Sequence, residues 1–101
     1  RANPELIEEY IASQADVPAN TFYQDFLACS VFDVTQRVGE IKLPTLIVVG
    51  LDDKMTPLKL SHFMHENIKG SQLVTIENAG HMTMIEQPEE LNKAINSFVS
   101  A

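Results

Sequence analysis

The stretch Thr45-Leu-Ile-Val-Val-Gly50 decides the fold of this 101-residue chain. It is a continuous run of apolar, mostly β-branched residues that ends at a glycine. Such a run is typical of a strand that is buried on both faces, as strands of parallel sheets are. Pro44 precedes the strand, and Leu43 before it avoids the helical region of backbone space. The chain is therefore predicted to enter a buried parallel strand in an extended conformation.

The residues after this strand alternate between helix and strand patterns. Residues 56–70 begin with Thr56-Pro57, a cap followed by a proline at the first helical position, and carry an apolar stripe at helical spacing. Residues 72–77 are predicted to form a second strand, and Pro88 opens a final helix with an apolar face. The order strand, helix, strand, helix predicts two parallel strands joined by a right-handed crossover. Two such strands are too few for an independent sheet, so part of a doubly wound α/β sheet is expected.

The residues before this α/β portion are predicted to be helical. Asn3-Pro4 provides a cap and a first-turn proline for a first helix, and a second helix is expected to follow Asn20. A short third helix is expected to start at Asp33, with Gln36 reaching back to complete the cap, and to stop around Gly39. A helical segment therefore precedes the sheet.

The composition is that of an ordinary globular chain with an acidic surface. Fourteen Asp and Glu residues against seven Lys and Arg residues give a net charge of −7, without any basic run. Such a surface repels nucleic acid and anionic membranes, and the apolar runs are far too short to span a bilayer. No secretory leader is visible, and the single Cys29 cannot form an internal disulfide. We therefore expect no nucleic-acid or membrane partner and a reducing, cytoplasmic location.

Residues suited to proton transfer follow both predicted strands. Asp52 and Asp53 come shortly after Gly50, and His81 follows the second strand. In an open α/β sheet, reactive groups gather on loops beyond the carboxyl ends of the strands, so adjacent parallel strands bring these loops together. A carboxylate that bonds a histidine fixes the imidazole tautomer and stabilises the imidazolium that forms during proton transfer. The sequence thus predicts an acid–histidine pair at this edge of the sheet.

Two motifs resemble the α/β-hydrolases. Ile41–Pro57 is similar to the seventh strand and acid loop of that family, and Ala79–Pro88 is similar to its histidine loop and the start of its last helix. In the family the acid lies three residues after the strand-ending glycine, which implies Asp53 rather than Asp52. The family histidine follows a glycine and is trailed by a glutamate and a proline, which implies His81. The order acid then histidine also agrees with the family order Ser, Asp, His.

The resemblance implies a fold and a site. Residues 34–101 would form the last βαβα portion of an α/β-hydrolase core, with two parallel strands and flanking helices, and residues 1–33 would form a cap-like helical segment before it. Asp53 and His81 would be catalytic, with no cofactor and no metal. The nucleophile elbow Gly-x-Ser-x-Gly is absent, since no two of the four glycines lie four residues apart. The chain is therefore expected to be the carboxyl-terminal part of an enzyme, inactive alone, and paired with the missing amino-terminal half or with a second copy of itself.

Three functions stay open. The first is a serine-type hydrolase of an ester or related acyl substrate, such as a carboxylesterase, lactonase or C–C hydrolase. The second is a dehalogenase or epoxide hydrolase on the same fold, with an aspartate nucleophile. The third is a non-catalytic fragment that associates with itself through exposed strand edges. We predict the first, with His81 as general base and then general acid, and with Asp53 orienting it.

Other candidate residues have plainer explanations. His62 and His65 lie three apart on a predicted helix, but further metal ligands are not placed near them in sequence, so a solvated helix face is expected. Cys29 has no neighbouring cation to activate its thiol and is expected to be a small apolar core residue. The acidic clusters, Glu86 among them, are expected on solvated helix faces and helix starts. Tyr23 and its aromatic neighbours either line a substrate pocket or pack their helix onto the rest of the fold.

Overall fold

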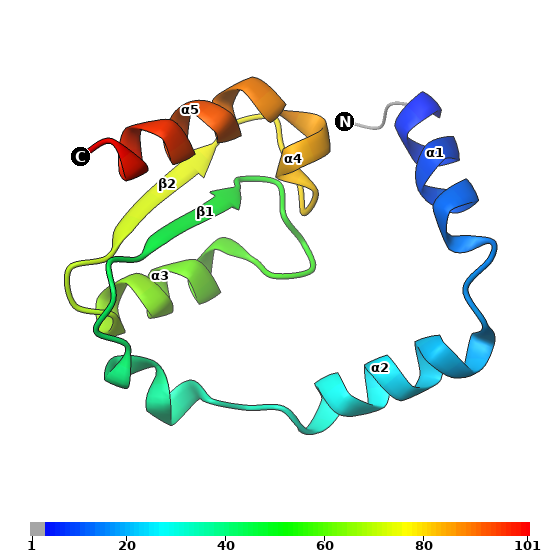
Figure 1. The fold of residues 1–101 in the computed structure, drawn as a ribbon, viewed down its shortest axis with the longest axis horizontal. Coiled ribbons are helices and arrows are strands. Elements are labelled where there is room, and N and C mark those ends of the chain that lie inside the picture. The colour runs from blue at the N-terminus through cyan, green and yellow to red at the C-terminus, as the bar shows by residue number, and fades with distance from the viewer. Residues whose placement is uncertain (1–3) are drawn as a thin grey trace. The chain divides into compact units, whose positions relative to one another are not determined.

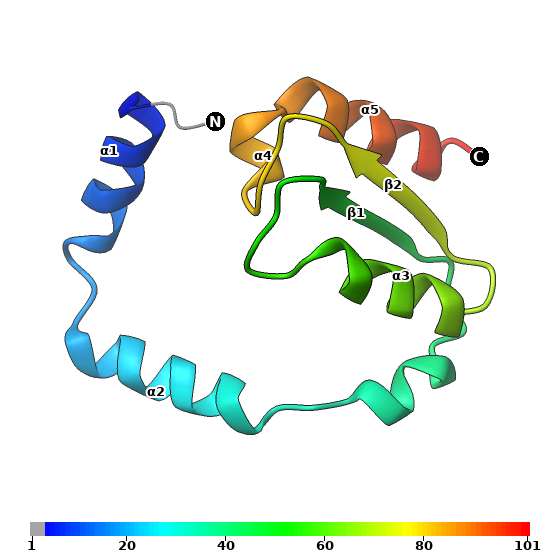
Figure 2. The same cartoon turned by 180° about the vertical axis from the view of Figure 1, so that it is seen from behind.

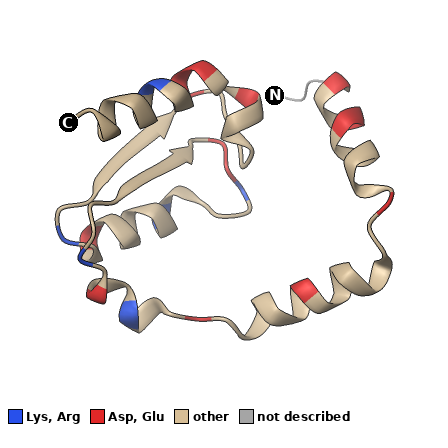
Figure 3. Cartoon of the chain, viewed as in Figure 1, with Lys and Arg blue, Asp and Glu red and all other residues tan. Residues whose placement is uncertain are grey.

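The computed structural model describes residues 4–101, which divide into two units. The first unit ends at Thr35, and the second runs from Gln36 to Ala101. Asn3, the predicted cap of the first helix, lies outside the described residues. Asp and Glu residues occur in both units (Figure 3). Every helix within residues 4–101 is too short or too polar to cross a membrane.

Two helices make up the first unit. They are α1 (Pro4–Gln14) and α2 (Ala19–Val31), and they form where the sequence predicts two helices. Neither helix contains a buried residue, and Tyr23 is 63% exposed. Cys29 is exposed as well, so the expectation that it is a core residue is wrong. The apolar residues that produce the helical pattern are thus exposed or half-buried.

A 3₁₀ helix, η1 (Thr35–Glu40), takes the place of the third predicted α-helix. The Asp33 carboxylate accepts the backbone N–H of Thr35 at 2.9 Å, only two residues along the chain. An aspartate that bonds the backbone two residues on makes a local turn, and this turn competes with an α-helix. Asp33 therefore closes a turn instead of starting an α-helix.

The second unit is built on a two-stranded parallel sheet with flanking helices. Its main elements follow one another as β1 (Leu46–Gly50), α3 (Leu58–Asn67), β2 (Gln72–Ile76) and α5 (Pro88–Val99). Leu46 lies opposite Gln72 and Gly50 lies opposite Ile76, so the strands are in full register. Figures 1 and 2 show α3 on one side of the sheet and α5 on the other. The predicted βαβα order is therefore confirmed.

The core of this unit lies at the sheet. Along β1, Ile47 and Val49 are buried, whereas Leu46 and Val48 are half-buried, so one face of the strand is covered more completely than the other. Burying one such aliphatic side chain contributes about 1.5–3 kcal/mol to stability. The buried apolar residues are Ile47, Val49, Ile68, Ile76 and Ala79.

Two local features depart from the predicted pattern. A single helical turn, α4 (Thr83–Glu86), lies between the histidine loop and the final helix, where no element was predicted. α3 begins later than predicted, because Pro57 occupies the cap position instead of the first helical position. Thr56 does not cap the helix, since its hydroxyl bonds the side chain of Asp53. Both departures occur on the loops that leave the carboxyl ends of the strands.

These two loops lie so close together that the last residue of β1, Gly50, has no room for a side chain. The backbone N–H of Asp52 donates to the carbonyl of Ala79 at 2.9 Å, which ties one loop to the other. A Cβ atom on Gly50 would lie 2.3 Å from the carbonyl oxygen of Gly80 and 2.4 Å from that of Ala79. Both contacts are with backbone atoms, so a side chain at Gly50 fits only if the loop of Gly80 shifts.

Replacing Gly50 by alanine is expected to cost about 1–3 kcal/mol of stability or more, the range typical of overpacking. The matched control is Gly39→Ala, because a Cβ atom there would meet its nearest neighbour at an ordinary 3.5 Å. Urea unfolding followed by circular dichroism measures both variants. Equal stability of the two variants would show that the close approach at Gly50 imposes no constraint.

Candidate active site

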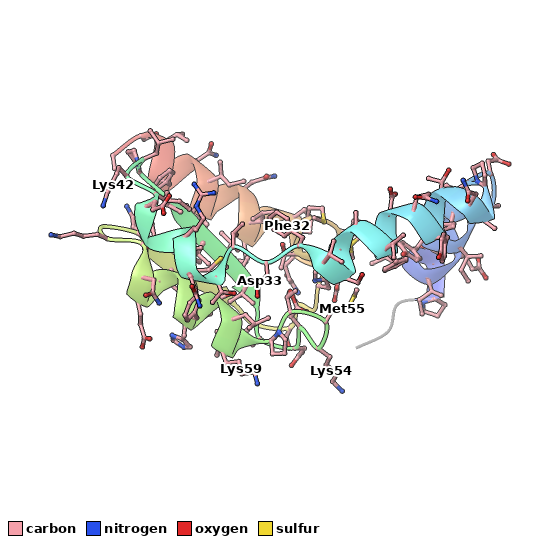
Figure 4. The ribbon with its side chains drawn as sticks, turned by 90° about the horizontal axis from the view of Figure 1, so that it is seen from below. Phe32, Asp33, Lys42, Lys54, Met55 and Lys59 are labelled. Carbon is pink, nitrogen blue, oxygen red and sulfur yellow. The ribbon has the colours of Figure 1, made fainter. Side chains whose placement is uncertain are left out.

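Asp53 lies on the loop between β1 and α3, and its side chain bonds the residues that follow it on this loop. Its Oδ1 accepts the backbone N–H groups of Met55 at 3.0 Å and Thr56 at 2.9 Å. Aspartates commonly bond the backbone a few residues ahead in this way, because the short side chain reaches it without strain. The Asp53 side chain is only 6% exposed. In contrast, Met55 and Lys54 on the same loop are exposed; Figure 4 labels both.

His81 lies on the loop between β2 and α4 and meets Asp53. Its Nδ1 is 3.0 Å from Asp53 Oδ2, although 28 residues separate the two in the chain. Since an ionised carboxylate only accepts hydrogen bonds, Nδ1 carries the hydrogen and donates it. The other ring nitrogen, Nε2, is then free to accept a proton, as a general base requires. With 41% of its side chain exposed, the imidazole is reachable from outside.

The structure thus selects between the two adjacent acids. Asp53 contacts His81, whereas Asp52 is exposed and contributes its backbone N–H to the loop of Ala79. The family resemblance implies Asp53 as the acid, and Asp53 is the one of the two whose carboxylate lies beside His81. The backbone N–H groups of Met55 and Thr56, which follow Asp53 in the chain, hold its carboxylate at this place.

Thr56 is a third member of the cluster that sequence reasoning missed. Its Oγ1 donates to Asp53 Oδ2 at 2.9 Å and lies 3.2 Å from His81 Nδ1. The sequence pattern assigned this threonine to a helix cap. Its spacing of three residues after an aspartate was the available signal, because that spacing also lets the aspartate cap the threonine's own N–H.

The hydrogen bonds around Asp53 determine its charge. The backbone N–H of Thr56 is the largest of the causes that lower the Asp53 pKa from 3.8 to about 2. Burial opposes this effect, and the His81 ring, the Thr56 hydroxyl and the Met55 N–H add to it. Each donor stabilises the ionised form. Asp53 is therefore a carboxylate at neutral pH, which is the form that orients a histidine and stabilises an imidazolium.

Glu86, at the end of α4, contacts the histidine loop. Its Oε1 accepts the backbone N–H of Gly80 at 3.0 Å, and its Oε2 accepts that of Met82 at 3.3 Å. The side chain is half-buried, so the expectation of a solvated glutamate is wrong at this position. The acidic residues of the first turn of α5, Glu89 and Glu90, are exposed as expected.

The two remaining histidines lie away from this cluster. His65 Nδ1 is 2.9 Å from the Ser71 hydroxyl, where the chain leaves α3, and His62 is exposed. Within residues 4–101, no three His, Cys, Asp or Glu side chains gather in a way that could hold a metal ion. Of the three histidines, His81 is the one whose ring lies within hydrogen-bonding distance of a carboxylate among these residues.

An acid and a histidine on loops beyond the carboxyl ends of parallel strands are the arrangement expected of an α/β-hydrolase. A family model described as TAP-like protein, an α/β-hydrolase model, matches residues 15–101. The chain belongs to the α/β-hydrolase family. The family predicted from the acid and histidine motifs is thereby confirmed.

Similar proteins include hydrolases with different names. A 3-oxoadipate enol-lactonase of Acinetobacter baylyi is 33% identical over 99 residues, which cover 98% of this chain and 37% of the relative. A proline iminopeptidase of Saccharolobus solfataricus is 41% identical over 68 residues, which cover 67% of this chain and 22% of the relative. The chain thus spans 37% of the length of the enol-lactonase.

Solved structures show the same fold. A hydrolase from Pseudomonas aeruginosa has a TM-score of 0.89 and 28% identity, covering 100% of this chain and 37% of that one. An esterase from Exiguobacterium antarcticum has a TM-score of 0.89 and 26% identity, covering 100% of this chain and 38% of that one. The two parallel strands and their helices are therefore a portion of an α/β-hydrolase fold, as predicted.

Replacing Thr56 by valine removes the hydroxyl that donates to Asp53 and keeps the backbone N–H. The pKa of Asp53, about 2, is expected to rise toward its ordinary 3.8. Carbon-13 NMR of the Asp53 carboxyl group across the acid range measures this shift. Thr56→Ser retains a hydroxyl donor and serves as the control. An unchanged Asp53 titration in the valine variant would contradict the assigned hydrogen bond.

Acid unfolding provides a second check on Asp53. Because its folded pKa lies below its unfolded value, ionised Asp53 stabilises the fold above about pH 3.8, and this stabilisation is lost as the pH falls toward 2. Asp53→Asn is therefore expected to flatten the pH dependence of stability within this window. The measurement is urea unfolding at a series of pH values, with Asp52→Asn as the control.

Proposed function

We propose that this chain supplies the acid and the base of a Ser-His-Asp triad, in a hydrolase that acts on esters or related acyl substrates. The observation that carries the proposal is the 3.0 Å contact between His81 Nδ1 and Asp53 Oδ2, made by residues at the acid and histidine motifs of the family. The low pKa of Asp53, held down first by the Thr56 N–H, supports the charge that this role needs.

In the proposed reaction, His81 Nε2 takes the proton of a serine hydroxyl as the serine oxygen attacks the acyl carbon. Asp53 stabilises the imidazolium, which then gives its proton to the departing alkoxide. The acyl-enzyme remains. His81 next takes a proton from water, whose oxygen attacks the acyl carbon, and returns that proton to the serine oxygen as the acid product leaves. The reaction requires no cofactor.

The substrate class follows from what the relatives are called. The relative that matches 98% of this chain is named an enol-lactonase, and a structure that covers 100% of it is named an esterase. A lactone is a cyclic ester, so both names describe attack on the same kind of carbonyl. These names support an ester or lactone as the substrate proposed here.

The nucleophile is proposed to come from sequence beyond these 101 residues. No Gly-x-Ser-x-Gly occurs in them, and a histidine oriented by an aspartate has nothing to activate without a nucleophile. The proposed partner is an amino-terminal portion that carries the nucleophile, and this chain covers only 37% and 22% of two longer relatives. The chain on its own is therefore expected to be inactive.

The test uses the complete protein, meaning this chain joined to that amino-terminal portion, with aryl esters and a small lactone as substrates. Asp53→Asn is expected to lower kcat by about 10⁴-fold, and His81→Ala by about 10⁶-fold. Asp52→Asn is the control and should keep its activity, because that carboxylate does not contact His81. Full activity in both Asp53→Asn and His81→Ala would exclude the proposed triad.

Mass spectrometry of the trapped intermediate distinguishes the nucleophile. A serine hydrolase accumulates an acyl-serine, whereas a dehalogenase or epoxide hydrolase accumulates an alkyl ester on an aspartate. The isolated chain supplies a further comparison. A stable, inactive dimer of the chain alone, together with an inactive complete protein, would favour the self-associating fragment.

A further inference from the structure

The loop that carries His81 is irregular and needs support on both sides. It runs between β2 and α4 and includes Asn78, whose φ of 59° is left-handed. On the β2 side, Ala79 is 1% exposed and its carbonyl accepts the N–H of Asp52 at 2.9 Å. This bond anchors only the residue two before the histidine. The backbone around His81 itself must be held by other groups.

Glu86 provides that support. Its two carboxylate oxygens accept the N–H groups of Gly80 at 3.0 Å and Met82 at 3.3 Å, the residues directly before and after His81. The backbone N–H of Glu86 also donates to the Met82 carbonyl at 2.9 Å, so side chain and main chain bind the same loop. An ionised carboxylate has two oxygens that only accept, which matches two converging N–H donors.

The glycine before His81 makes room for this carboxylate. A Cβ atom on Gly80 would lie 3.2 Å from Glu86 Oε2, closer than Cβ atoms usually approach a neighbour, and at an ordinary 3.6 Å from Oε1. A side chain at this position would require the Glu86 carboxylate to move by a few tenths of an ångström. Gly80 leaves the space that the carboxylate of Glu86 occupies.

We propose that Glu86 is a positioning residue that clamps the backbone on both sides of His81 and so fixes the imidazole against Asp53. It acts through the histidine loop and touches neither substrate nor the reacting atoms. Its effect on catalysis rests on the proposed function, whereas the clamp itself is a structural claim with its own test.

The test compares Glu86→Gln with Glu89→Gln in the complete protein. Glutamine has nearly the same shape but one acceptor oxygen, and its NH₂ group faces a second N–H donor. Glu89 is exposed in the first turn of α5, so its variant removes the same charge without touching the loop. Hydrogen exchange of the Gly80 and Met82 amides, measured by NMR, should accelerate about 10-fold or more only in Glu86→Gln. Equal exchange in both variants overturns the clamp.

A measurement on the unmodified protein covers the case in which Glu86→Gln does not fold. Amide protons bonded to a carboxylate shift when that carboxylate is protonated. The amide shifts of Gly80 and Met82 should therefore follow the same titration midpoint as the side-chain carboxyl carbon of Glu86. Amide shifts that do not follow this carbon overturn the proposal.

Kinetics test the positioning role. In Glu86→Gln, kcat is expected to fall about 10- to 100-fold while KM stays unchanged, because a displaced base slows chemistry without altering the substrate pocket. A kcat equal to that of the parent enzyme overturns the positioning role. An inactive parent enzyme instead overturns the proposed function, and the amide measurements then still decide the clamp. The two failures are therefore distinguishable.

Discussion

The parallel pairing of β1 and β2 is the constraint on which the rest of the site depends. Full register places Gly50 opposite Ile76, so both strands end at the same edge of the sheet and both loops leave there together. Asp53 and His81, 28 residues apart in the chain, meet at 3.0 Å for this reason. An antiparallel pair would send the second loop to the opposite edge. The missing side chain of Gly50 then lets the two loops touch.

Carboxylates shape both of these irregular loops. Asp53 gathers the backbone N–H groups of Met55 and Thr56, and Glu86 gathers those of Gly80 and Met82. Backbone N–H groups in loops lack the acceptors that helices and sheets provide. A carboxylate side chain nearby in the sequence can accept two such N–H groups at once. Asp53 Oδ1 accepts two backbone N–H groups of its own loop, and Oδ2 faces both the Thr56 hydroxyl and His81, so the bonds that fold the loop also orient the carboxylate.

The long elements were predictable because their patterns are long. The apolar run of β1 and the stripe of α5 each extend over several residues, and packing agrees with their periodicity. The site was predictable only as far as Asp53 and His81. α4 is four residues long, too short to show a period. In the sequence, Thr56 and Glu86 match helix-start patterns. A hydroxyl or carboxylate group accepts or donates the same hydrogen bonds at a helix cap as in a loop, so only the three-dimensional fold decides between these two roles.

The hydrogen bonds described around the acid and histidine all come from residues 50–86, within the second unit. The proton transfer proposed for His81 would therefore depend on short-range bonds that one unit makes for itself. Under that condition, substrate choice is free to vary elsewhere in a protein without disturbing the pair. Proteins named enol-lactonase, proline iminopeptidase and esterase all resemble this chain over a minor share of their own lengths, at 37%, 22% and 38%. If the proposed acid–histidine pair is held by its own unit in this way, hydrolases with different substrates are expected to share such a segment.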